Sequence, residues 1–268
     1  MSQAVHEIAP SLAHPRPIRL EPKAQGWLVR IGTPSRQAKR SLFCFTHAGG
    51  GAVDFRDWRP LLPDDMDLFA LQLPGRGSRL QEPPAEKMSE VINQVLALLP
   101  PYLDKPFAFF GHSLGGRIAF ALAQQLQLRG LPTAQLLTVA ASRPPGFNAV
   151  NVIGMSDESL LSHLIELGGM TAEILDNDEL IKLSLPSIRA DFILHNSLNV
   201  PSHPLVCPVL SIGGRSDSSI GRQHVQRWQD TTQSTFSLEM VDGDHFFPRK
   251  DRAQVIQMIL DRFSETVN

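Results

Sequence analysis

The sequence Gly-His-Ser-Leu-Gly at residues 111–115 constrains the fold of this chain more than any other feature. It follows the apolar run at 106–110, which has the pattern of a buried strand, and precedes residues 116–123, which have the pattern of a packed helix. The glycines two positions either side of Ser113 permit a cramped turn with an unusual serine backbone. The pentapeptide alone also arises by chance in loops, but a strand, this turn and a helix in succession predict a nucleophilic Ser113.

Strand-like and helix-like segments alternate along the rest of the chain. Strands are expected at residues 27–31, 41–45, 68–73, 106–110, 136–141, 207–212 and 236–241, and helices at 54–61, 88–99, 116–129 and 253–263. This alternation predicts an α/β fold, with a mostly parallel central sheet and helices on both of its faces. Residues 1–25 are expected to form a loosely ordered extension, and residues 26–268 a single domain.

The segment at about 144–204 differs in kind, because it contains no core strand. Its pattern predicts three helices, at 157–167, 172–183 and 185–198, which we interpret as a helical lid over the active-site end of the sheet. The alternative is an ordinary pair of crossover helices. The apolar positions of this segment are expected to form a buried core for the most part, with two or three of them lining a pocket: Leu160, Leu164, Leu167, Ile188, Phe192 and Leu194.

Composition agrees with an enzyme of this size. The 268 residues are 42% hydrophobic, and the net charge of −2 offers no bulk attraction to nucleic acid or to an acidic membrane. Cys44 and Cys207 both lie in apolar strand-like runs, so we expect buried free thiols rather than a disulfide or a metal site. We also expect no secretory signal and no membrane-spanning run, and therefore a cytoplasmic location.

A serine hydroxyl needs a base and an acid that orients the base. In folds of this kind the chain order is serine, acid, histidine. His245 follows the last strand in a loop that can reach the sheet's end, whereas the other histidines after Ser113 lie in the lid, a proline-rich loop or a helix (His163, His195, His203 and His224). Asp217 follows a buried strand and is the expected acid, with Asp242 or Asp244 in reserve.

An oxyanion hole needs two backbone N–H groups directed at the developing charge. One is expected from Leu114, directly after the nucleophile, and the other from Ala48, in the glycine-rich loop 47–51 that follows an early strand. Glycine-rich loops also bind phosphates. However, the chain contains neither G-x-x-x-x-G-K-[ST] nor G-x-G-x-x-G, so the phosphate interpretation is weak.

Four motifs in succession resemble one family. They are His-Ala-Gly-Gly at 47–50, Leu-Pro-Gly-Arg-Gly-Ser-Arg at 73–79, Gly-His-Ser-Leu-Gly-Gly at 111–116 and Gly-Asp-His-Phe-Phe at 243–247. From about residue 41 to its end, the chain resembles the type II, stand-alone editing thioesterases of nonribosomal peptide and polyketide synthesis. The resemblance implies the α/β-hydrolase fold with a helical lid. Arg189, Asp191 and Phe192 also resemble the lid signature of that family.

Two positions depart from the family pattern. Thr46 stands where the family usually has proline, and Asp244 stands where a second glycine usually precedes the histidine. The second departure places a carboxylate beside the expected base, which leaves the choice of acid less secure. The first forty residues are not explained by the resemblance.

The resemblance implies hydrolysis of acyl groups from the phosphopantetheine thiol of carrier proteins, by a monomer that needs no metal or organic cofactor. Without the resemblance, the residues predict only a serine hydrolase with a covered pocket. Two other functions therefore stay open, a small-molecule carboxylesterase with the same triad and a non-catalytic binding module. Arg76 and Arg79 could steer the pantetheine phosphate, although loop-stabilising or solvated charges are the more common role of such residues.

Overall fold

A single sheet organises the molecule. The computed structural model describes residues 26–34, 37–169, 176–198 and 203–267, so the expected extension at 1–25 lies outside the described residues. In these residues a 7-stranded sheet has the order β1-β3-β2-β4-β5-β6-β7. Its strands are β1 (Leu28–Arg30), β2 (Arg40–Phe45), β3 (Met66–Leu71), β4 (Phe107–His112), β5 (Leu136–Ala140), β6 (Val209–Gly214) and β7 (Phe236–Val241). Only β1 pairs antiparallel, with β3, which confirms the mostly parallel sheet.

The central strands are apolar along nearly their whole length because both faces of the sheet are covered. Every residue of β3, β4, β5 and β6 is buried, whereas the edge strand β7 is mostly half-buried. Phe43 pairs in register with Phe69 on one side and with Phe109 on the other. Its ring stacks on Phe69 and meets Phe109 edge-on, so aromatic contacts fix the register across three strands.

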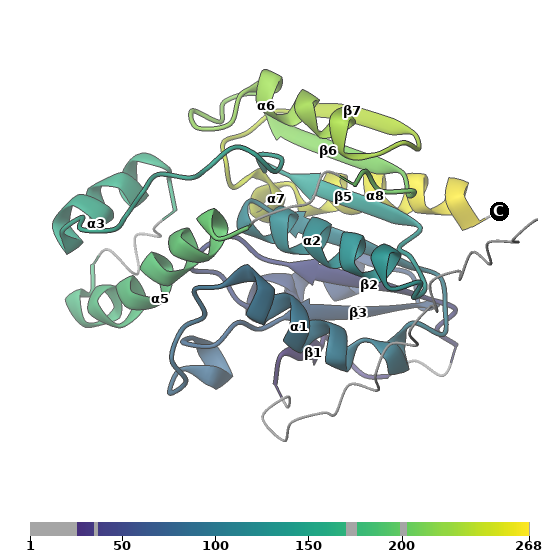
Figure 1. The fold of residues 1–268 in the computed structure, drawn as a ribbon, viewed down its shortest axis with the longest axis horizontal. Coiled ribbons are helices and arrows are strands. Elements are labelled where there is room, and N and C mark those ends of the chain that lie inside the picture. The colour runs from purple at the N-terminus through teal and green to yellow at the C-terminus, as the bar shows by residue number, and fades with distance from the viewer. Residues whose placement is uncertain (1–25, 35–36, 170–175, 199–202, 268) are drawn as a thin grey trace, which may run out of the picture.

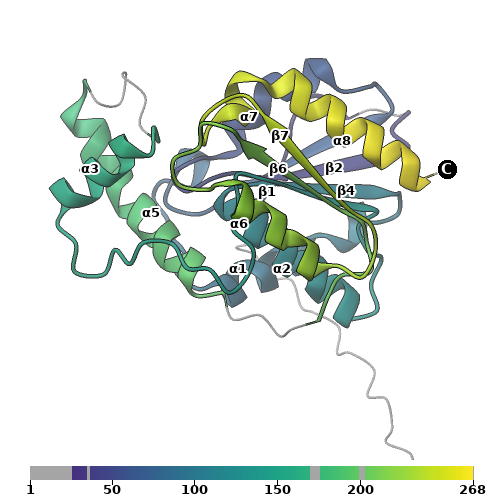
Figure 2. The same ribbon diagram turned by 90° about the horizontal axis from the view of Figure 1, so that it is seen from above.

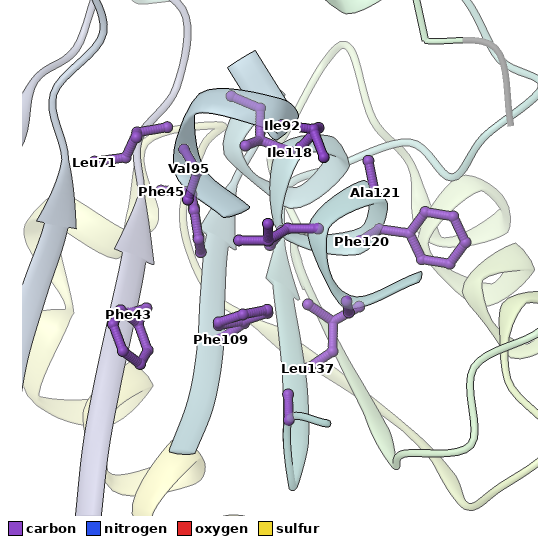
Figure 3. Packing of buried hydrophobic residues seen from close by; sticks show 14 of the residues in the cluster. Phe43, Phe45, Leu71, Ile92, Val95, Phe109, Ile118, Phe120, Ala121 and Leu137 are labelled. Carbon is purple, nitrogen blue, oxygen red and sulfur yellow. The ribbon is translucent and has the colours of Figure 1, made fainter. Parts of the chain in front are cut away.

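Helices cover both faces of the sheet. On one face, α1 (Met88–Leu98) and α2 (Leu114–Leu128) pack Val95 and Ile118 against Phe109 and Leu137 (Figure 3). On the other face, the 3₁₀ helix η2 (Ala52–Leu61) and α8 (Arg252–Val267) bury a second cluster. Figure 2 shows α8 on one side of the sheet and α1 and α2 on the other. The shorter elements are η3 (Gly77–Arg79), η4 (Pro100–Tyr102), α6 (Arg222–Gln226), η5 (Arg227–Thr231) and α7 (Phe247–Lys250).

The segment between β5 and β6 projects from the sheet. Its helices α3 (Asp157–Glu166) and α5 (Asp178–Asn196) lie beyond one end of the strands and not on a face (Figures 1 and 2). They share a small apolar cluster that includes Leu160, Leu164, Ile188 and Phe192, while Leu194 joins the main core. This arrangement supports the lid over ordinary crossover helices, and it confirms that the apolar lid positions are mostly core.

The division of the lid into three helices is wrong in one respect. The predicted helix at 172–183 begins outside the described residues, and from Asp178 onward the chain continues as one helix through the expected break near residue 184. Pro186 lies inside this helix, where it lacks an N–H to donate. Burial of Leu185 and Ile188 on either side of Pro186 compensates, so packing overrides the local preference.

The strand order reverses beside β2, because the chain passes from β2 outward to β3 and then returns to β4. Ligands of such sheets bind where loops diverge at the carboxyl ends of the strands on either side of this point. The loop after β2 is the glycine-rich segment 47–51, and β4 leads directly to Ser113. The topology therefore brings these two motifs together.

Two further observations concern the chain as a whole. Cys44 and Cys207 are free and buried, as expected, and burial raises the pKa of the Cys207 thiol to about 11. Within the described ranges, no helix has the length and apolar character needed to cross a bilayer.

Candidate active site

Ser113 occupies the strained turn that its flanking glycines predicted. It joins β4 to α2 with φ 54° and ψ −115°, in the region that side chains rarely adopt. The glycines are required by close approach: a Cβ on Gly111 would lie 2.3 Å from the Gly115 carbonyl oxygen, and one on Gly115 would lie 2.0 Å from that of Phe45. The Ser113 amide donates to the Ala140 carbonyl at 2.9 Å, which ties the turn to β5.

Asp217 and His245 come from neighbouring strand ends and meet side chain to side chain. The Nδ1 atom of His245 lies 2.8 Å from Oδ2 of Asp217, which follows β6, while His245 follows β7. Because an ionised carboxylate only accepts, this contact makes Nδ1 the donor and leaves Nε2 free to take a proton. Ser113 and His245 line the same cavity, so the structure brings the three expected triad residues to one site.

The second oxygen of Asp217 is held by its own turn. Oδ1 accepts from the amide and the hydroxyl of Ser219, both at 2.8 Å, and from the amide of Ile220 at 3.0 Å. Burial acts to raise the pKa of Asp217, but the hydrogen bond from His245, its charge and the bonds from Ser219 outweigh burial, so the pKa is lowered. The acid is therefore ionised and oriented at neutral pH.

The two reserve acids have other partners. Asp244 accepts from Lys250 Nζ at 2.6 Å and from the Phe246 amide at 2.9 Å, at the start of α7. Asp242 pairs with Arg215 at 3.2 Å, and its side chain is 97% exposed. The geometry thus favours Asp217 over both.

The cavity at the serine is small, with a volume of about 120 Å³. Ala48 and Leu114 line it together with Ser113, as an oxyanion hole built from their amides requires. Its apolar wall includes Leu167 and Phe192 from the lid. This agrees with the expectation that two or three of the apolar lid positions line a pocket. His163 and His195 also line the cavity, whereas His224 packs against Phe147.

The glycine-rich loop is anchored to the core by Asp54. Its carboxylate accepts from the Thr46 hydroxyl at 2.7 Å and from the Gly51 amide at 3.1 Å. Thr46 Oγ1 also lies 3.0 Å from Nδ1 of His47. Since the Thr46 proton goes to Asp54, His47 donates to Thr46, and the threonine that departs from the family pattern thereby holds the His47 ring.

His112 is a supporting residue that the sequence did not reveal. Its Nε2 donates to the His245 carbonyl at 2.8 Å, so the residue before Ser113 supports the backbone of the expected base. Burial lowers the pKa of His112 well below its usual value, and burial together with nearby charges lowers the pKa of His47 to about 3. Both rings are therefore neutral. Position 112 lies inside the serine motif, but nothing local predicts its partner.

The three lid residues have different roles. Asp191 is buried against Arg76 and the Gly49 amide at the edge of the cavity, and Phe192 also lines the cavity. Arg189 points elsewhere and bonds Asp157 at 2.7 Å and the Val152 carbonyl at 2.9 Å. It holds the lid helices together rather than contacting the site.

Arg76 and Arg79 stabilise loops, the more common of the two roles considered. Arg79 is 4% exposed, bonds both oxygens of Glu82 and lies over the Trp27 ring. Arg76 is 8% exposed and bonds Asp191. Neither side chain is among those that line the cavity at Ser113.

Comparison with known proteins gives a consistent family. A family model described as the thioesterase domain matches residues 40–263. The gramicidin S biosynthesis protein GrsT of Aneurinibacillus migulanus is 31% identical over 236 residues, which cover 87% of this chain and 92% of GrsT.

Solved structures agree with that match. The type II thioesterase BorB from the borrelidin biosynthetic cluster superposes with a TM-score of 0.80 at 29% identity, over 88% of this chain and 97% of BorB. RedJ, a thioesterase of the prodiginine pathway in Streptomyces coelicolor, gives a TM-score of 0.77 at 30% identity, over 85% of this chain and 94% of RedJ. The chain has the α/β-hydrolase fold of these enzymes and belongs to the thioesterase family, with type II thioesterases among its structural relatives.

Proposed function

We propose that this thioesterase hydrolyses acyl groups from the phosphopantetheine thiol of carrier proteins in a nonribosomal peptide or polyketide synthetase. The observation that supports it most is the combination of a thioesterase match over residues 40–263 with the 2.8 Å contact of Asp217 and His245 at the cavity of Ser113. GrsT is named for gramicidin S biosynthesis and BorB for the borrelidin biosynthetic cluster, which supports a carrier protein as the partner. In this proposal the enzyme acts as a cytoplasmic monomer.

The chemistry follows from the positions of the three side chains. Ser113 attacks the thioester carbonyl carbon while His245 takes the hydroxyl proton at Nε2, and the oxyanion is stabilised by the amides of Ala48 and Leu114. The C–S bond breaks, and His245 returns the proton to the leaving thiolate. Asp217 holds the ring and stabilises its positive charge throughout.

Water completes the reaction. His245 takes a proton from water as its oxygen attacks the acyl-serine, and the proton returns to Ser113 as the carboxylic acid leaves. The products are the free acid and the carrier thiol, so the step needs no oxidant, metal or organic cofactor. Leu167 and Phe192 provide an apolar surface for the acyl chain within the cavity.

The test uses a carrier protein whose pantetheine arm carries an acetyl or longer acyl group. Mass spectrometry measures the appearance of free carrier thiol. We expect Ser113→Ala to lower turnover by about 10³-fold or more with unchanged circular dichroism. Ser89→Ala, on the exposed side of α1, is the matched control and should behave as the wild type.

The other functions give different outcomes in the same experiment. Turnover of p-nitrophenyl esters without release of acyl groups from any carrier would identify a small-molecule carboxylesterase. Absence of both activities, with no labelling of Ser113 by a fluorophosphonate probe, would identify a binding module.

A further inference from the structure

The carboxylate of Asp191 belongs to the lid helix α5 but makes its contacts in the hydrolase core. Asp191 is 0% exposed. Its Oδ2 atom accepts from the Gly49 amide at 2.7 Å and also from Nη1 of Arg76, while Oδ1 accepts from Nη2 of Arg76 at 2.7 Å. A charge so completely removed from water needs partners of this kind, and it is costly to keep where no function or fold depends on it.

Arg76 makes a second contact with the same loop, at the following residue. Its Nη1 atom donates to the Gly50 carbonyl at 3.4 Å, and its Nε to the Pro74 carbonyl at 3.4 Å. The ion pair therefore forms hydrogen bonds with two consecutive residues of the glycine-rich loop, at the amide of Gly49 and at the carbonyl of Gly50. The first contact restrains the peptide between Ala48 and Gly49, and the second restrains the peptide between Gly50 and Gly51 in the same loop.

Helix α5 also packs directly against this part of the loop. Gly49 has φ +82°, and a Cβ there would lie 2.9 Å from Cγ1 of Ile188, one turn before Asp191 on α5. The ends of the loop are held within the core, where Asp54 binds Thr46 and the Gly51 amide. Its middle is held from the lid. The loop is thus restrained from two sides, by the core at its ends and by α5 at its middle.

We infer that Asp191, with Arg76, is a positioning residue for the oxyanion hole: the lid helix α5 fixes the loop that presents the Ala48 amide to the reacting carbonyl. This inference rests on the proposed serine mechanism, but not on the identity of the acyl carrier. In consequence, the half of α5 around Asp191 is a fixed wall of the active site, and opening of the lid takes place elsewhere.

The test is Asp191→Asn, which keeps the shape of the side chain but removes its charge and one acceptor oxygen. Misplacing one oxyanion donor costs about 10²-fold in kcat. We therefore expect kcat for an acyl carrier and for a p-nitrophenyl ester to fall about 10²-fold, with KM changed by less than about threefold. Binding of an acyl trifluoromethyl ketone, whose adduct carries an oxyanion, should weaken by about the same factor as kcat/KM.

Asp157→Asn is the matched control. It breaks the 2.7 Å ion pair between Asp157 of α3 and Arg189, which lies on the side of α5 opposite Asp191. We expect turnover and ketone binding close to those of the wild type. A second variant, Arg76→Met with Asp191→Leu, removes both charges and so avoids an unpaired buried ion. We expect the double variant to be more thermally stable than Asp191→Asn but to have a kcat as low as that variant. It therefore tests the inference even where Asp191→Asn does not fold.

Two outcomes would overturn the inference. One is wild-type kcat and ketone affinity in folded Asp191→Asn, and the other is full recovery of kcat in the double variant, which would reduce the pair to a structural contact. Failure of the wild-type enzyme to release acyl groups from carriers would instead refute the proposed function, since the ester and ketone measurements still report on the loop.

Discussion

At the residue scale, the two carboxylates nearest to the expected base are distinguished by their contacts. Asp217 bonds Nδ1 of His245, whereas Asp244 bonds Lys250 and the start of α7. Asn at either position keeps the size and loses the charge. We expect Asp217→Asn to lower kcat by about 10³- to 10⁴-fold, because the imidazole loses both its tautomer and the stabilisation of its positive charge. Asp244→Asn should cost less than about threefold.

Steady-state kinetics on an acyl carrier or a p-nitrophenyl ester, with circular dichroism as the check on folding, separates these cases. A larger loss in Asp244→Asn than in Asp217→Asn would show that the acid lies beside the base in sequence, as the departure from the family pattern allowed.

At the element scale, the lid divides into an anchored part and a lightly held part. The C-terminal half of α5 buries Asp191, and Leu194 enters the main core. In α3 only Leu160 and Leu164 are buried. Few buried contacts favour local opening, so we expect the α3 amides to exchange with solvent at least about tenfold faster than those from Ile188 to Leu194.

Hydrogen exchange followed by mass spectrometry measures this difference, with the amides of β4 as the slow reference. Addition of an acyl carrier should change exchange in α3 more than in the anchored half of α5. Exchange in α3 as slow as in β4, and unaffected by the carrier, would refute a moving lid and favour a rigid pocket.

At the scale of the whole molecule, three buried neutral histidines make stability depend on pH. Burial lowers the pKa of His47 and of His195 to about 3, and that of His112 well below its usual value. The unfolded chain titrates near the ordinary value of about 6.5, so below it the unfolded state binds more protons. The free energy of unfolding therefore falls as the pH falls below that value, by about 1.4 kcal/mol per pH unit for each histidine.

Urea unfolding at pH 7, 6 and 5 tests this dependence, and His195→Gln is the informative variant because it removes one of the three groups. Between pH 6 and pH 5 we expect its free energy of unfolding to fall by about 1.2 kcal/mol less than that of the wild type, with about half that difference between pH 7 and pH 6. An unchanged slope would mean that His195 is not held neutral in the folded protein.

Much of this protein could be predicted from local patterns. The apolar runs of β2, β4 and β6 are short and bounded, as expected of buried strands. The glycines around Ser113 indicate a turn that only small residues permit. Asp217 and His245 could be chosen because parallel strands bring their carboxyl ends to one edge, so residues after β6 and β7 must lie near each other. The continuity of α5 through residue 184 could not be predicted from the local sequence, because it depends on packing on both sides of Pro186.

The sequence by itself thus determined the fold class and predicted the nucleophile and the chemistry of the site, since each depends on neighbours within a few residues or on strand order. The tertiary structure alone decided which groups support that chemistry. Asp191 meets Arg76 across 115 positions of sequence, and His112 meets His245 across 133. No periodicity links such distant residues, because their contact depends on how the lid and the last loop pack against the finished sheet.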